Sequence, residues 1–279
     1  MSACVKGVLP SGPLAEIAEA WVWFRDFAAS YQREESSLLL LKVRHTERVV
    51  GLAGNIVAEV GLAEGSRRSA FLAALLHDVG RFPQFAQWRT FRDDISANHG
   101  RLGARVLRDA SVLKAEAPAV RRAAIAAVAL HNRYVLPANL PEQTRLITNI
   151  VRDADKIDIL RIFSEELSKP EPSGEVVLHV AREPERWTPA VADMIVRGLV
   201  PEYRQLRYVN DFIMLLCSWP AELNFPVSLR LVREAGHVGK LMEHLPGAPE
   251  LDAVRQAARE FLLRGKSGRQ ALKDAMFSC

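Results

Sequence analysis

The sequence predicts an all-α fold, a helical core followed by a helical C-terminal extension. Apolar residues recur at spacings of three and four through most of the chain, and helix-capping and helix-ending residues stand at several expected boundaries. Only one short segment departs from this pattern. With 279 residues, of which 49% are hydrophobic, the chain is long enough and apolar enough to bury a sizeable core.

Five helices are expected in the first half of the chain, over residues 37–62, 66–80, 98–110, 117–132 and 141–167. The first carries an apolar stripe formed by Leu41, Val49, Leu52, Ile56 and Val60. Ser66 is the expected N-cap of the second helix, and Gly80 is its expected C-terminal stop. Pro137 and Pro141 mark the connection before the last helix of this half.

The second half follows the linker-like stretch "SKPEPSG". Residues 173–184 are expected to form either a short strand pair or an irregular excursion, and helical patterning returns near residue 188. We therefore expect three parts: an N-terminal helical segment over 1–36, a helical core over 37–167, and a mainly helical extension over 168–279 packed on that core.

Composition narrows the classes of protein. No apolar run approaches the roughly 20 residues that cross a bilayer, and the N-terminus lacks the pattern of a secretory signal, so we expect a cytoplasmic protein without a membrane partner. Cys4, Cys217 and Cys279 are scattered and are expected to be free thiols. The net charge of +4 is spread along the chain without an aromatic-basic motif, so no nucleic-acid partner is expected. Formation of a homo-oligomer is left open.

Metal-binding side chains recur at long intervals through the expected core. They are His45, His77, Asp78, His99 and His131, followed by Asp153, Asp155 and Asp158. Such distant residues meet only if several helices converge on one point, as in the metal sites of helix bundles. Imidazole and carboxylate together favour Mn, Fe, Co, Ni or Zn, and one bridging carboxylate would allow two ions.

The order His45 … His77-Asp78 … Asp155 resembles the H…HD…D signature of the HD-domain superfamily of metal-dependent phosphohydrolases, over roughly residues 40–165. His99 and His131 resemble the additional histidines of its binuclear branch. That branch includes the HD-GYP phosphodiesterases and the di-iron oxygenases related to myo-inositol oxygenase. The resemblance implies an HD-domain helical bundle with two divalent transition metal ions per chain (Mn, Fe, Ni, Co or Zn). Asp78 would bridge them, and the four histidines and Asp155 would complete the ligand set.

Three positions refine the resemblance. On a helix, Asp155 and Asp158 share a face, whereas Asp153 points about 200° away from Asp155; the family pattern aligns with Asp155, and Asp153 is the alternative. Arg81 stands where the HD-GYP pattern has a lysine on the reacting phosphate, and no G-Y-P motif lies near His131. Lys156 falls where the nucleotide triphosphohydrolases of the superfamily use a lysine on phosphate.

The resemblance implies hydrolysis of a phosphomonoester or phosphodiester by metal-activated hydroxide. The expected substrate is a nucleotide or a related small phosphorylated molecule, with Arg81 and Lys156 offsetting charge on the phosphoryl oxygens. A di-iron oxygenase that cleaves a C–C or C–P bond with O₂ would use the same ligands, and a non-catalytic ligand sensor is a third reading. Asp93-Asp94 is expected to be a turn or N-cap feature.

Overall fold

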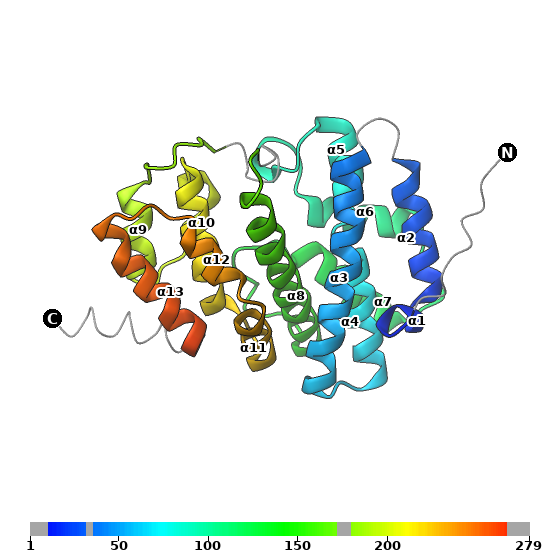
Figure 1. The fold of residues 1–279 in the computed structure, drawn as a ribbon. Helices are drawn as coiled ribbons and strands as arrows, with labels where there is room; N and C mark the ends of the chain where they lie inside the picture. Colours follow the sequence, from blue (N-terminus) through cyan, green and yellow to red (C-terminus); the bar gives the residue numbers. More distant parts are fainter. Residues whose placement is uncertain (1–10, 32–35, 172–179, 267–279) are drawn as a thin grey trace. The chain divides into compact units, whose positions relative to one another are not determined.

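The computed structural model describes residues 11–31, 36–171 and 180–266. Helices account for the regular secondary structure of these ranges, and no strand forms within them, as the sequence predicts (Figure 1). None of the described helices combines the length and the apolar character needed to cross a membrane. The chain divides into two compact units, Met1–Ala154 and Asp155–Cys279. The boundary between these units falls inside helix α8 (Glu142–Leu167), and the N-terminal helices belong to the first unit.

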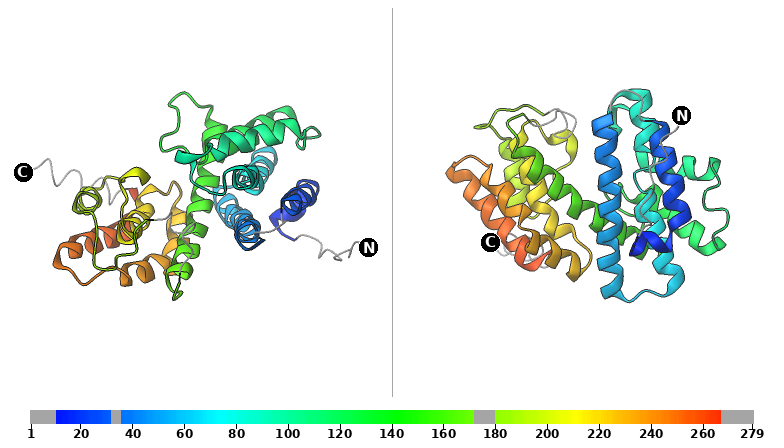
Figure 2. Two further views of the ribbon diagram at one scale, coloured as in Figure 1. Left: turned by 90° about the horizontal axis from the view of Figure 1, so that it is seen from above. Right: turned by 45° about the vertical axis from the view of Figure 1, so that its right-hand side comes forward.

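The first unit holds α1 (Pro13–Glu16), α2 (Ala18–Ser30), α3 (Ser36–Val60), α4 (Glu64–Leu76), α5 (Arg81–Trp88), the 3-10 turn η1 (Asp93–Ile95), α6 (His99–Asp109), α7 (Pro118–Leu130) and the first half of α8. Helix α4 packs against both α3 and α7, and α6 packs on α7 (Figures 1 and 2). Every residue of α4 from Ser69 to Leu76 is buried. The unbroken apolar run "FLAALL" therefore belongs to a central helix that is covered on all sides.

The two ends expected for α4 are wrong. Ser66 lies inside the helix, which begins after Ala63, and its hydroxyl accepts a hydrogen bond from the Gln143 side chain at 3.1 Å. Gly80 does not stop the helix, because α4 already ends at Leu76 and Gly80 directly precedes α5 with an ordinary right-handed φ of −68°.

Gly80 instead allows two backbones to meet. A Cβ at this position would lie 2.1 Å from the carbonyl oxygen of His99 and 2.6 Å from the backbone nitrogen of Gly103. Gly100 plays the same part against α7, since a Cβ there would lie 2.9 Å from the carbonyl oxygen of Val128. Together these glycines bring the first turn of α6 into direct contact with the turn after α4 and with α7.

The second unit contains α9 (Pro189–Val196), η2 (Tyr203–Gln205), α10 (Val209–Ser218), η3 (Trp219–Glu222), α11 (Pro226–Ala235), α12 (His237–Glu243), η4 (Pro249–Leu251) and α13 (Asp252–Arg264), after the second half of α8. Helix α10 is central here and packs against α9, α12 and α13. The helical pattern over 228–245 is split by Gly236, whose φ of 68° separates α11 from α12.

Asp211 ties α10 to the start of α9. Its fully buried carboxylate accepts hydrogen bonds from the backbone and hydroxyl of Thr188, at 2.6 and 2.7 Å, and from the backbone N–H groups of Arg207 and Tyr208. Of the segment 173–184, expected to be a strand pair or irregular, residues 173–179 lie outside the described residues. Ala181 makes one isolated parallel bridge with Tyr208.

Candidate metal centre

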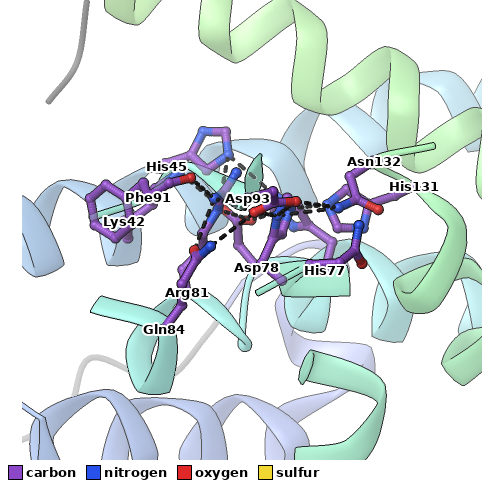
Figure 3. Close-up of polar contacts among 12 residues, drawn as sticks. Lys42, His45, His77, Asp78, Arg81, Gln84, Phe91, Asp93, His131 and Asn132 are labelled. Carbon is purple, nitrogen blue, oxygen red and sulfur yellow. Dashed lines mark hydrogen bonds and ion pairs between the residues drawn. The ribbon is translucent and has the colours of Figure 1, made fainter. Parts of the chain in front are cut away.

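The helices of the first unit bring four histidines and one aspartate together. Figure 3 labels His45, His77, Asp78 and His131 of this cluster. His45 lies on α3, His77 and Asp78 lie in the turn after α4, His99 is the first residue of α6, and His131 directly follows α7. All five side chains are buried. Histidines separated by 22 to 32 positions in the sequence therefore meet at one point, because several helices converge there as expected from the sequence.

These residues form two groups that could each hold a metal ion. One consists of His45, His77 and Asp155, and the other of Asp78, His99 and His131. Within each group, one ligand atom from every residue lies within 4.8 Å of the others. Asp155 directly follows the last residue of the first unit on the continuous helix α8. The alternative aspartate, Asp153, is fully buried and belongs to neither group.

The carboxylate of Asp78 faces both groups. Its Oδ1 atom lies 3.5 Å from Nε2 of His99, and its Oδ2 atom lies 3.8 and 3.9 Å from Nε2 of His77 and His45. Oδ1 is thus turned toward His99 of one group, and Oδ2 is turned toward His77 and His45 of the other. This is the orientation that a bridging carboxylate between two ions requires.

The hydrogen bonds of the imidazoles test whether the site fits a metal. Nδ1 of His77 and Nδ1 of His131 each donate to a backbone carbonyl three residues earlier, at 2.8 Å, and Nδ1 of His99 donates to Asp93. In a neutral imidazole this leaves a lone pair on Nε2. The Nε2 atoms of His99 and His131 lie 3.0 Å apart, and those of His77 and His45 lie 3.3 Å apart. Nδ1 is occupied in both His99 and His131, so their Nε2 lone pairs face each other and repel at this distance, and this pair fits a cation that both nitrogens can bind.

Asp93 connects this cluster to its surroundings, although the sequence indicated only a turn or cap there. Its carboxylate accepts from Nδ1 of His99, from Arg81 at 3.2 Å, and from the side-chain amides of Gln84 and Asn132 at 2.9 Å each. Burial alone would raise the pKa of Asp93, but His99, Arg81 and Gln84 lower it to about 2. Asp93 begins the three-residue 3-10 turn η1, which is too short to give a periodic signal that could have paired Asp93 with His99.

Two cations flank Asp78. Nε of Arg81 lies 3.4 Å from Oδ1, and the ammonium of Lys42 donates to Oδ2 at 2.8 Å. Burial raises the pKa of Asp78, but Lys42, His77, Arg81 and His99 outweigh it and hold this pKa well below its usual range. The sequence interpretation had missed Lys42. Its position three residues before His45, on the same face of α3, was the available signal.

The guanidinium of Arg81 is held in place from several sides. It donates to the side chain of Gln84 at 3.0 Å and to the backbone carbonyl of Phe91, and it lies 5.8 Å from the centre of the Phe91 ring. The buried Nε–H has no hydrogen-bond acceptor among the described residues. One N–H donor of the planar guanidinium is therefore left beside the Asp78 carboxylate.

Lys156 lies in the second unit. Its ammonium is 3.7 Å from the carboxylate of Glu222 and 5.6 Å from the centre of the Trp219 ring. Its assignment to a phosphate group stays a prediction from the family pattern.

Comparison with known families agrees with this geometry. Residues 43–160 match the family model of the HD domain, and the matched range encloses all six residues of the two groups. The chain therefore contains an HD domain, and the members of that superfamily are mostly metal-dependent phosphohydrolases. No curated protein and no solved structure matches the chain.

Proposed function

We propose that this protein is a metal-dependent phosphohydrolase acting on a phosphomonoester or phosphodiester of a nucleotide or related small molecule. The observation that carries the proposal is the surroundings of Asp78. This carboxylate faces two groups of metal-binding residues, with the cations Lys42 and Arg81 beside it. Metal ions held by these ligands would activate a water molecule, and the adjacent cations would attract an anionic substrate.

His45, His77 and Asp155 would hold one ion, and Asp78, His99 and His131 the other. Bound divalent ions would supply Lewis acidity, which lowers the pKa of water and offsets negative charge on a phosphoryl group. The histidines contribute by keeping Nδ1 occupied, so that Nε2 is presented as a ligand atom.

Arg81 would bind the phosphoryl oxygens. Its guanidinium is already oriented by Gln84, Asp93 and the Phe91 carbonyl, so little side-chain freedom is lost when an anion binds. Lys42 would add a point charge on the other side of Asp78. Lys156 is a further proposed phosphate contact, based on the family pattern.

The test combines metal content with activity. Protein expressed with several metals supplied is examined by elemental mass spectrometry, then assayed with nitrophenyl phosphate, bis-nitrophenyl phosphate and a panel of nucleotides. We expect one or two equivalents of Mn, Co, Ni or Zn and hydrolysis that a chelator abolishes. His77→Gln should abolish activity, whereas His244→Gln, an exposed histidine outside both groups, should not. Arg81→Met should lower kcat/KM about 100-fold.

Two results would overturn the proposal. About two irons per chain, with O₂ consumed in the presence of a phosphonate or a polyol, would assign the di-iron oxygenase chemistry that the same ligands allow. Failure to bind any metal after reconstitution would exclude a metal centre at these residues.

A further inference from the structure

The proposed ligand His99 donates a hydrogen bond to the carboxylate of Asp93. We propose that Asp93 is a positioning residue that fixes the orientation of His99 and sets the metal affinity of the group formed by Asp78, His99 and His131. The inference rests on the proposed function only in requiring that this group binds a metal. Asp93 belongs to neither ligand group, so it would act through His99.

The contact between Asp93 and His99 determines which imidazole nitrogen carries the proton. Both carboxylate oxygens lie 2.8 Å from Nδ1 of His99. An ionised carboxylate can only accept hydrogen bonds, so Nδ1 must donate and Nε2 is left with its lone pair. Nε2 is the atom that faces His131 at 3.0 Å and Asp78 at 3.5 Å.

The other partners of Asp93 keep its carboxylate ionised and in place. Arg81, Gln84 and Asn132 all present N–H donors to it, at 2.9 to 3.2 Å. The fully buried amide of Gln84 also donates to Ser96 and to the carbonyl of Ala97, at 2.9 Å each. Together with the bond from Arg81 to the Phe91 carbonyl, these bonds hold the segment between α5 and α6 on both sides of Asp93.

Asp93 gives His99 a different kind of hydrogen-bond acceptor from those of His77 and His131. Nδ1 of His77 and of His131 donates to a backbone carbonyl, whereas Nδ1 of His99 donates to a charged carboxylate. A carboxylate is the stronger acceptor and raises the basicity of the opposite ring nitrogen. Loss of its charge should therefore weaken metal binding at the group containing His99 and leave the group containing His45 and His77 largely unchanged.

The experiment is a Co²⁺ titration of metal-free full-length protein, followed by visible absorption and elemental analysis. Asp93→Asn is compared with Asp93→Glu and with Asp94→Asn. Asp94 is a matched control, since it is the next residue and its exposed carboxylate pairs with Arg92. We expect Asp93→Asn to weaken one class of site about 10- to 100-fold. Asp93→Glu should recover part of that loss, and Asp94→Asn should behave as the wild type.

The outcomes separate this inference from the proposed function. A wild-type protein that binds no Co²⁺ refutes the proposed function and this inference with it. Wild-type binding that is unchanged in Asp93→Asn refutes this inference alone. A loss shared equally by both classes of site refutes it as well, because it indicates a merely structural role.

A measurement on the wild type covers the case in which the variants do not fold. Long-range ¹⁵N correlation spectra of the histidine rings of the Zn²⁺-loaded protein report which nitrogen bears the proton, with His99→Gln used for assignment. A proton on Nδ1 of His99, strongly deshielded by the carboxylate, is expected. A spectrum that shows no Nδ1 proton on His99 would overturn the inference.

Discussion

Replacing Gly80 by alanine would probe the contact between the turn after α4 and the first turn of α6. The new Cβ would lie 2.1 Å from the carbonyl oxygen of His99 and 2.6 Å from the backbone nitrogen of Gly103. Ordinary van der Waals separation requires the two backbones to part by about 1 Å or more. Since φ at Gly80 is −68°, alanine suits the local backbone and the effect is purely steric.

Overpacking of this kind typically costs about 1–3 kcal/mol of unfolding free energy. For a folding unit of this size each kcal/mol lowers Tm by about 2–4 °C, so a decrease of several degrees is expected. The atom that must yield belongs to a proposed ligand, so the affinity for metal should fall together with the stability.

Gly51→Ala is the matched control. Gly51 lies on the exposed face of α3 in the same unit, and a Cβ there would meet no atom within 4 Å. The same substitution should raise the stability by about 0.5–1 kcal/mol, because glycine is unfavourable inside a helix. Both variants are compared by circular dichroism during heating and by Co²⁺ titration. If Gly80→Ala were as stable as Gly51→Ala, the steric reasoning would be wrong.

Three further predictions concern other parts of the chain. Asp211→Ala should destabilise the second unit by about 2–3 kcal/mol because it leaves buried N–H and O–H donors without an acceptor. The control Asp193→Ala, at an exposed position, should change the stability by less than about 0.5 kcal/mol. Hydrogen exchange of the amides in α9 and α10 measures both effects. Burial raises the pKa of the Cys217 thiol to about 12, so iodoacetamide at pH 8 should modify Cys217 only after the protein unfolds. Rapid modification of the native protein, detected by peptide mass spectrometry, would contradict the burial of this thiol. The pKa of Asp93 is lowered from 3.8 to about 2, so its ionised form stabilises the metal-free protein above pH 3.8, and this contribution is lost as the pH falls toward 2. The stability difference between wild type and Asp93→Asn, measured in urea titrations, should therefore shrink between about pH 4 and pH 2.

The helices were largely predictable because their apolar spacing records which face is buried. The stripe on 37–62 corresponds to α3, and the continuous apolar run before His77 corresponds to the central helix α4. The ends were less predictable. Ser66 is a good cap in isolation, but the chain turns into α4 earlier, at Ala63, and the Ser66 hydroxyl bonds to Gln143 from a distant segment.

The candidate site was predictable where one residue type carries the chemistry, and it was missed where the role depends on a tertiary contact. Histidines at wide intervals are conspicuous, and the structure gathers all four of those singled out. Lys42 and Asp93 are common residue types in unremarkable surroundings. Their roles arise only when α3, α5 and α6 place them against Asp78 and His99.

The backbone contacts at Gly80, Gly100 and Gly103 bear on how this site tolerates mutation. Where helices meet through side chains, a change of core residue can shift them. At Gly80 and Gly100, however, a Cβ would meet main-chain atoms of the neighbouring element, and at Gly103 it would meet the backbone nitrogen of Gly80 and methyl groups of Val79 and Val128 at 3.2 Å. The spacing between His99 and His131 should therefore change little when side chains of the surrounding core are substituted. The spacing depends on the three glycines instead. A saturation mutagenesis screen for metal binding should find that substitutions of these glycines are tolerated as poorly as substitutions of the ligands, although the glycines themselves bind no metal.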